Sequence, residues 1–306
     1  MTVTRTLPSG LETQLRAAVR DVRRDEPLAR HVQFRIGGPA DLLVVPRSLE
    51  ELEAAARVLF AVGVVPVVLG QGSNVLIGDR GIRGVVLKLG KGVDRVRIRD
   101  TVVEAEAGAG LPALALQTAK RGLAGLEFAA GIPGSVGGGV VMNAGAHGHA
   151  MDEIVEHVDL VTPTGAQRLD RAALGFRYRT SVLQGEPWIV TRVTMRLRPE
   201  APATVKARLN AWLAHRGATQ PIGPPSSGCV FRNPPGDHAG RLIDQAGGKG
   251  LAVGDARVST LHANYIINEG QARAADVLAL AEQVRQRVRE HAGVTLEMEV
   301  KLLGEF

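Results

Sequence analysis

The order of hydrophobic and polar residues predicts a chain that mixes helices and strands. Residues 48–63 give the clearest helix, because Ser48 and Glu51 form a capping box and Gly63 is placed to end it. A second helix is predicted for residues 111–122, where a proline occupies the first turn and a glycine follows the end. Further helices are expected at residues 11–24, at residues 203–216 and at two places beyond residue 236.

Short apolar runs and alternating segments predict the strands. The run VVPVVL at residues 64–69 leads directly into GQGSN, and residues 190–199 alternate as in a half-buried strand. Other strands are expected at residues 41–45, 84–89, 93–98, 102–107 and 154–162. The last strand, residues 295–303, is predicted to place Leu296, Met298, Val300 and Leu302 on one face and Glu297, Glu299 and Lys301 on the other.

The pattern changes after Pro199, where a helix is followed by a loop rich in Gly, Pro and Ser at residues 221–236. We therefore expect a domain boundary near residue 199. With 306 residues, 45% of them hydrophobic, the chain has enough material for two or three domains, and a soluble α/β protein is the default expectation. No oligomerisation signature is evident, so we expect a monomer.

The N-terminus is charged and lacks the apolar core of a signal peptide, and the longest apolar run is too short to span a bilayer. We therefore expect a cytoplasmic protein without membrane insertion. The net charge of +6 is spread along the chain, and aromatic residues make up only 3%, which disfavours nucleic-acid binding. Scattered arginines are expected to form a solvated surface, with a few holding a phosphorylated small molecule.

Two glycine-rich stretches are the strongest candidates for ligand binding. GQGSN, residues 70–74, lacks the Lys-Ser/Thr ending of a P-loop, and Val75 stands where a dinucleotide fingerprint needs its last glycine. GIPGSVGGGVVMNAG, residues 131–145, has Pro133 in place of the first glycine of a nucleophile elbow, so Ser135 is not expected to be a hydrolase nucleophile. Together the stretches suit a dinucleotide cofactor; close packing of chain on chain is the alternative.

Reactive side chains occur in three further places. FRYRTS, residues 176–181, groups two arginines and a tyrosine, which is also the pattern of a solvated strand edge. Cys229, the one cysteine, excludes an internal disulfide, and we expect no metal site. A lone cysteine is more often a small buried hydrophobic residue than a catalyst. A cysteine hydrolase that pairs Cys229 with His262 or His238 is a rival hypothesis.

Seven motifs occur in an order that resembles the UDP-N-acetylenolpyruvoylglucosamine reductases, a flavoenzyme family of peptidoglycan precursor synthesis. The similarity runs from residue 28 to residue 305, and the short spacing after YRTS resembles the second type of this family, which lacks an extra substrate-covering loop. The motifs are FRIGGPADLLVVP, VLGQGSNVLI, GLEFAAGIPGSVGGGVVMNAGAHG, YRTS, GCVFRNPPGDHAGRLID, HANYIIN and LEMEVKLLGE.

The resemblance implies an α+β protein with a two-part FAD-binding fold of the vanillyl-alcohol-oxidase kind, followed by an α+β substrate-binding domain. The implied domains are residues 1–65 and 66–199 for FAD and residues 200–306 for the substrate. The cofactors would be FAD and NADPH, and the substrate UDP-N-acetylglucosamine enolpyruvate. Hydride would pass from NADPH to FAD and then to the β-carbon of the enolpyruvyl group.

The resemblance also implies roles for particular residues. Arg179 would stabilise charge on the substrate carboxylate, Glu299 would help to polarise that carboxylate, and Cys229 would protonate the α-carbon. Tyr178, Arg232 and Asn233 fall where the family contacts its substrate. HVQF stands where TTF is frequent in the family, so Gln33 marks a departure from the pattern. The expected flavin contacts are Gly70, Gln71, Gly72, Ser73, Asn74, Gly131, Gly134, Ser135, Gly137 and Gly138.

A third hypothesis keeps the fold and changes the chemistry. It is an FAD oxidase of small alcohols or sugars that uses oxygen as its electron acceptor. The reductase, the oxidase and the cysteine hydrolase differ in whether the protein holds flavin and in what re-oxidises it.

Overall fold

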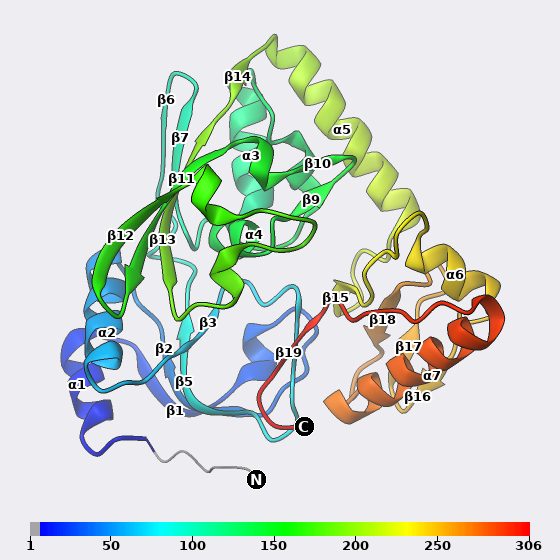
Figure 1. The fold of residues 1–306 in the computed structure, drawn as a ribbon, viewed down its shortest axis with the longest axis horizontal. Helices are drawn as coiled ribbons and strands as arrows, with labels where there is room; N and C mark the ends of the chain where they lie inside the picture. The colour runs from blue at the N-terminus through cyan, green and yellow to red at the C-terminus, as the bar shows by residue number, and fades with distance from the viewer. Residues whose placement is uncertain (1–6) are drawn as a thin grey trace. The chain divides into compact units, whose positions relative to one another are not determined.

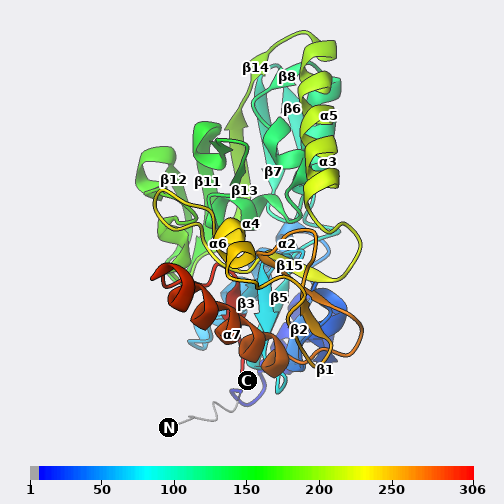
Figure 2. The same ribbon diagram turned by 90° about the vertical axis from the view of Figure 1, so that its right-hand side faces the viewer.

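A computed structural model describes residues 7–306 and shows an α+β protein (Figures 1 and 2). The chain divides into two compact units that are built from separated segments. Among the described residues, unit 1 contains residues 7–24 together with Asp41–Gln71 and Gly84–Arg216, and unit 2 contains Asp25–Ala40, Gly72–Arg83 and Gly217–Phe306. The domain boundaries expected at residues 65 and 199 stay predictions.

Unit 1 is built on a five-stranded sheet in which every neighbouring pair is antiparallel. Antiparallel pairing distinguishes this protein from the α/β default, in which helices connect parallel strands. Val193 and Met195 of β13 are fully buried, but Thr194 between them is buried as well, so the half-buried alternation expected for this strand was wrong. In order, the strands are β12 (Gly165–Asp170), β11 (Val155–Thr162), β13 (Ile189–Arg196), β7 (Val102–Glu106) and β6 (Val96–Arg99).

The helices of unit 1 confirm the Ser48 cap and the Gly63 end, but not the full capping box, because the Glu51 carboxylate accepts from the backbone N–H of Arg47 rather than that of Ser48. Ser48 accepts a hydrogen bond from the backbone N–H of Glu51 at the start of α2, and Gly63 beyond its end has a φ of 69°. In Figure 1, α3 lies between strands β6 and β7 and the long helix α5. The helices are α1 (Leu11–Ala18), α2 (Leu49–Ala61), α3 (Leu111–Lys120), α4 (Val136–Val141) and α5 (Pro202–Thr219).

A four-stranded sheet leads the chain to the first glycine stretch. Its order is β1 (Val22–Pro27), β2 (Pro39–Val44), β5 (Ile82–Lys88) and β3 (Val67–Leu69), and β3 runs parallel to β5 and ends directly before Gly70. The helix predicted for residues 11–24 is therefore too long. It ends at Ala18 because Val22 begins a sheet strand, and sheet pairing overrides the local helical pattern.

Unit 2 places two helices against a second antiparallel sheet. Helix α7 (Ala274–Ala292) packs on α6 (Ala239–Gln245) and on the last two strands of that sheet, β17 (Ala256–Val258) and β16 (Ala252–Val253). Val277, Leu280 and Val284 are buried on one face of α7 and form the core with residues of the sheet. The strand order is β15 (Ser226–Cys229), β18 (Tyr265–Asn268), β17 and β16.

Two sequence expectations for unit 2 were wrong. The loop expected at residues 221–236 contains β15, and only β19 (Lys301–Leu303) of the predicted last strand is a regular strand, paired in parallel with β4 (Val75–Ile77). The earlier part of that segment pairs instead with the segment around Phe231, through a bridge at Met298. Because the segment changes partner, its apolar face is not continuous, and Leu302 is 45% exposed while Leu296 is buried.

Short elements complete the fold. The remaining strands are β8 (Leu123–Ala124), β9 (Gly145–Ala146), β10 (His149–Ala150) and β14 (Arg198–Pro199), and the 3-10 helices are Leu28–His31, Glu127–Gly131, Met151–Glu153, Arg171–Leu174 and Val182–Gln184. Across residues 7–306, no helix combines the length and the apolar character that a membrane span requires.

Candidate active site

The two glycine-rich stretches meet inside unit 1. Gly70 follows strand β3 and lies against Ser135, so any Cβ at Gly70 would clash with the Ser135 hydroxyl. Gln71 lies against Gly110, which belongs to neither stretch: the Gln71 amide nitrogen is 3.1 Å from the place that a Cβ of Gly110 would take. The sequence neighbours Gly72, Ser73 and Asn74 belong to unit 2.

Several glycines of the second stretch lie where the packed chain leaves no free space for a Cβ. A Cβ at Gly137 would lie 2.8 Å from Ala107 Cβ, one at Gly139 would lie 2.8 Å from Leu111 Cδ1, and one at Gly131 would lie 2.9 Å from the Arg216 side chain. These distances are too short for real Cβ atoms. The packing alternative therefore accounts for these three positions without a ligand.

Gly138 differs from its neighbours because its backbone is exposed. A Cβ there would meet only the Ser135 hydroxyl, at 3.4 Å, and the residue lies on α4 between buried glycines. Gly134, just before Ser135, has a φ of 146°, which favours glycine. The surface at Gly138 is therefore bare, uncharged backbone. Such a surface fits a flat ring or a diphosphate that must approach the main chain closely.

Gly72 is held by contacts within unit 2. Its φ is 63°, and a Cβ would lie 2.7 Å from Val32 Cα. Its carbonyl accepts a 3.0 Å hydrogen bond from the backbone N–H of Gln33, the residue at which the chain departs from the family pattern. Two residues later, the Asn74 amide donates to the carbonyl of Glu299 at 3.4 Å. The segment after Gly72 thus positions the backbone of a candidate catalytic residue.

Arg179 occupies a tight turn in unit 1. The flanking residues Arg177 and Thr180 exchange two backbone hydrogen bonds of 3.0 Å, and Arg179 itself has a φ of 54°. Its guanidinium donates to the carbonyl of Gly145 at 3.0 Å and lies 5.1 Å from the centre of the Tyr178 ring. A non-glycine residue at positive φ is uncommon and is maintained only by its surroundings.

Three polar side chains fasten this turn to the end of α4. The Ser181 hydroxyl and the Gln184 amide both donate to the carbonyl of Val141, at 2.7 and 3.0 Å. The Gln184 amide also donates to the carbonyl of Arg179 at 2.9 Å, and Asn143 donates to the carbonyl of Arg177 at 3.1 Å. The turn is therefore built into the glycine-rich helix, which a solvated strand edge would not be.

Cys229 and Glu299 lie on paired segments of unit 2. The carbonyl of Val230, the residue after Cys229, accepts from the backbone N–H groups of Glu299 at 2.8 Å and Val300 at 3.4 Å. Cys229 ends β15, where it pairs with Tyr265, and it is partly exposed. The thiol and the carboxylate are thus carried by adjacent segments of backbone.

Asn264 fixes the segment that follows Cys229. Its side-chain oxygen accepts from the N–H of Phe231 at 2.9 Å, and its amide donates to the carbonyl of Phe231 at 2.7 Å. Its own carbonyl accepts from the N–H of Val230 at 2.9 Å. Asn264 is only 3% exposed, so these bonds satisfy buried backbone groups that water does not reach.

Arg232 and Lys301 bring positive charge to this part of unit 2. The Arg232 Nε atom is buried without a hydrogen-bond partner among residues 7–306, and its Nη1 lies 3.8 Å from the Glu297 carboxylate. Burial lowers the pKa of Lys301, and the Arg232 charge lowers that pKa further. Asn233 accepts from the N–H of Ala239 at 3.0 Å, which leaves its amide nitrogen as the donor for a ligand.

The cysteine hydrolase finds no support in this geometry. His262 accepts from the N–H of Asn264 at 3.3 Å and packs edge-on against the Tyr265 ring, and burial lowers its pKa. Within residues 7–306, neither His262 nor His238 forms a hydrogen bond to Cys229. A nucleophilic cysteine needs an adjacent base, so this pairing is not formed.

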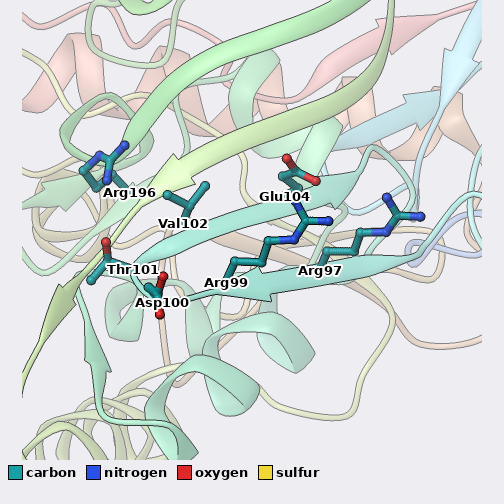
Figure 3. A pocket seen from close by; sticks show the side chains of 7 residues that line it. All are labelled: Arg97, Arg99, Asp100, Thr101, Val102, Glu104 and Arg196. Atoms are coloured by element: carbon teal, nitrogen blue, oxygen red, sulfur yellow. The ribbon is translucent and has the colours of Figure 1, made fainter.

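A surface pocket has a volume of about 360 Å³, and none of the candidate residues lines it. Figure 3 shows the side chains that do. The pocket lies over the β6–β7 hairpin, where Arg97 stands opposite Glu104 in the strand register. Charges of both signs over a solvated sheet face are an ordinary protein surface. Its lining residues are Arg97, Arg99, Asp100, Thr101, Val102, Glu104 and Arg196.

The supporting residues around the site were not foreseen from the sequence. Asn143, Gln184 and Asn264 act on backbone atoms far away in the chain, so local patterns do not reveal them. The motif letters contained a partial signal, because Ser181 ends YRTS and Asn264 lies within HANYIIN. Polar residues inside apolar motifs could have been marked as backbone clamps.

Comparison with known proteins supplies the family. A model of the C-terminal domain of UDP-N-acetylenolpyruvoylglucosamine reductase matches residues 220–303, and an FAD-binding domain model matches residues 40–169. UDP-N-acetylenolpyruvoylglucosamine reductase 2 of Symbiobacterium thermophilum is 47% identical over 97% of both chains. The chain belongs to this reductase family. The Rubrobacter xylanophilus reductase is also 47% identical, over 92% of this chain and 95% of its own.

A solved structure agrees with this assignment. The crystal structure of UDP-N-acetylenolpyruvylglucosamine reductase from Thermus caldophilus has a TM-score of 0.79 and 38% identity, covering 92% of this chain and 98% of its own. The expected fold class, a two-part FAD-binding fold with a C-terminal α+β domain, is confirmed. The protein is an FAD-dependent oxidoreductase of a family that uses FAD and NADPH in peptidoglycan precursor synthesis.

Asn264 offers a test of the backbone clamp. Asn264→Leu keeps much of the side-chain volume but leaves the buried N–H and C=O of Phe231 unpaired, so the free energy of unfolding is expected to fall by about 1–3 kcal/mol. Urea denaturation of the variant and wild type measures this change. Gln271→Ala, at an exposed position, is the control. An Asn264→Leu protein as stable as the control would contradict the clamp.

Proposed function

We propose that the protein reduces the enolpyruvyl group of UDP-N-acetylglucosamine enolpyruvate to a lactyl ether, giving UDP-N-acetylmuramate, with NADPH as the hydride source. The names of its relatives and the matched FAD-binding domain support this reaction. The observation in the structure that carries the proposal is the Arg179 guanidinium, held in a strained turn on the glycine-rich helix α4. Bound FAD would accept hydride from NADPH and pass it to the substrate.

The FAD would be held by backbone rather than by side chains. Gly138 offers exposed, uncharged main chain on α4, and Ser135 and Gly70 lie next to it. Close approach of the main chain to the cofactor requires residues without Cβ atoms, which this stretch provides. Gly131 and Gly137 would act indirectly, because the space that a Cβ would fill at each of them is taken by other atoms of the chain. Their close packing would set the shape of the stretch that holds the FAD.

Arg179 is proposed to stabilise the negative charge that develops on the substrate carboxylate. When hydride adds to the β-carbon of the enolpyruvyl group, electron density moves through the α-carbon toward that carboxylate. A guanidinium that is already oriented stabilises this charge without reorganising at the moment of reaction. The hydrogen bond to Gly145 and the Tyr178 ring orient the guanidinium.

Glu299 is proposed to act on the same carboxylate. Its backbone is held from both sides, because its N–H donates to Val230 and its carbonyl accepts from Asn74. A carboxyl group that approaches another carboxylate has to carry or share a proton, since two like charges at short range disfavour each other. Glu299 would then donate a hydrogen bond to the substrate carboxylate and increase its electron demand.

Cys229 is proposed to complete the reduction by protonating the α-carbon. Hydride supplies two electrons and one hydrogen at the β-carbon, so one proton is still required at the α-carbon for a balanced reaction. The thiol is partly exposed on a segment that Val230 and Phe231 hold by backbone bonds. The resulting thiolate would regain its proton from solvent.

Three further residues are proposed to bind the sugar nucleotide. Arg232 is suited to its diphosphate, since its buried Nε has no hydrogen-bond partner in the described part of the chain. Asn233 keeps an amide donor after it accepts from Ala239. Tyr178 is 54% exposed and presents both a ring and a hydroxyl.

An anaerobic titration tests the proposed reaction against the oxidase. Purified protein reconstituted with FAD should be bleached by NADPH and should regain its yellow colour when UDP-N-acetylglucosamine enolpyruvate is added without oxygen. Re-oxidation only by oxygen, in the presence of a small alcohol or sugar, would favour the oxidase. Protein that holds no FAD after reconstitution would exclude both flavin reactions.

Arg179→Ala is expected to slow re-oxidation of the reduced flavin by the enolpyruvyl substrate by roughly a hundredfold or more, the scale of losing one preorganised donor. Bleaching by NADPH should be unchanged, because the proposed partner of Arg179 is the substrate carboxylate. Stopped-flow absorbance follows both half-reactions. The matched control is Arg177→Ala, whose exposed side chain leaves from the same turn. Equal slowing of both half-reactions would count against the proposed role.

Cys229→Ala and Cys229→Ser separate a proton donor from a small buried residue. A serine still donates a proton, so Cys229→Ser should complete the sugar-nucleotide product, whereas Cys229→Ala should be reduced by NADPH and then fail to complete it. If Cys229 only fills space, the order reverses, because a hydroxyl at this half-buried position is less favourable than a methyl group. Stopped-flow re-oxidation and product analysis of both variants decide the assignment.

A further inference from the structure

Lys88 is a half-buried lysine next to the first glycine stretch. It is the last residue of β5 and stands opposite Leu69 in the parallel pairing of β5 with β3. Leu89 donates its N–H to the carbonyl of Leu69 at 2.8 Å, which fixes the strand ends together. The Lys88 ammonium donates a hydrogen bond to the carbonyl of Gly70. A positive charge is therefore attached to the loop that meets Ser135.

The surroundings of Lys88 supply no negative charge. Strand β3 and residues 131–145 contain no titratable side chain, and on β2 the carboxylate of Asp41 accepts from the N–H of Gly84, four residues away along β5. Four strand residues span about 13 Å. Within residues 7–306, Lys88 forms no ion pair with a carboxylate. Burial without a counterion lowers its pKa to about 8.

A half-buried ammonium without an anionic partner is unfavourable, so its place against a ligand loop indicates that the ligand supplies the anion. Gly70 lies in the matched FAD-binding region and touches Ser135, beside the exposed backbone of Gly138. FAD carries a diphosphate, and its isoalloxazine ring becomes anionic on reduction. Both are negative groups that a lysine can stabilise without direct covalent chemistry.

We propose that Lys88 is a positioning residue for FAD, which fixes the Gly70–Gln71 backbone through the Gly70 carbonyl and provides the positive charge for an anionic part of the bound cofactor. The inference rests on the proposed function, because it requires FAD at the glycine stretches. It goes beyond that function by assigning a second task, charge compensation, to a residue outside both glycine motifs.

Because Lys88 can gain or lose a proton, FAD affinity should depend on pH. Its pKa in the folded chain is about 8, below its ordinary value of 10.5, so between these values the folded chain binds fewer protons than the unfolded chain. Stability of the protein without FAD therefore gains from Lys88 as the pH rises through this window. An anion bound near Lys88 raises its pKa again. FAD binding then takes up a proton, and FAD affinity falls as the pH rises above about 8.

Titration of flavin-free protein with FAD, followed by quenching of flavin fluorescence, tests the proposal across this pH range. Wild type should bind FAD and lose affinity above about pH 8. Lys88→Met should bind FAD about tenfold or more weakly near neutral pH and show a flat pH profile. Lys88→Arg should keep near-native affinity and remain charged, so its profile should also be flat. Lys91→Met, an exposed lysine three residues away, is the matched control.

Two further measurements identify the anion, and one of them uses only wild type, so the test does not depend on whether the Lys88→Met protein folds well. If Lys88→Met weakens FAD but not riboflavin, the diphosphate is the partner; if it lowers the flavin midpoint potential instead, the reduced ring is the partner. Calorimetry of wild type in two buffers of different ionisation enthalpy should detect proton uptake on FAD binding above about pH 8. Wild type without proton uptake, or a Lys88→Met protein with native affinity, pH profile and potential, would overturn the proposal. Wild type that binds no FAD would instead overturn the proposed function.

Discussion

The contacts of the short helix α4 determine how the candidate site of unit 1 is built. Three of its six residues are glycines, which disfavour a helix by about 1 kcal/mol each relative to alanine. Tertiary packing compensates, because Gly137 and Gly139 let the helix lie directly on Ala107 and Leu111. The carbonyl of Val141 at its C-terminal end then receives two side-chain donors from the Arg179 turn. One close approach of backbone to backbone therefore orders both the glycine surface and the guanidinium.

In unit 2, side-chain amides hold the backbone of the candidate catalytic residues in place. The segments that carry Cys229 and Glu299 pair through a single bridge and a few backbone bonds rather than a continuous ladder. Irregular buried backbone leaves donors and acceptors that water does not reach, and each needs a partner. Asn264 supplies partners for Phe231, and Asn74 supplies one for Glu299. The chemistry assigned to these segments thus depends on amide groups that take no part in it.

Most charged side chains discussed above are solvated, and only a few are held in place for a proposed function. Arginines on the sheet face form exposed ion pairs, as Arg168 and Arg192 do with Asp159, and such pairs contribute little stability. Arg179, Arg232 and Lys88 differ because backbone contacts or burial restrict them. A net charge of +6 therefore describes the surface, while the proposed chemistry rests on a few oriented cations.

The sequence by itself determined the elements whose signals are local and the family whose motifs occur in a fixed order. Helix α2 was predictable because Ser48 caps it within three residues, and the reductase family because seven motifs recur together. Only the tertiary structure decided that Gly137 serves packing while Gly138 is open, that residues 19–24 leave the helix for a sheet, and that Lys88 reaches Gly70. These outcomes depend on contacts between residues far apart in the chain, which hydrophobic periodicity and capping patterns do not encode.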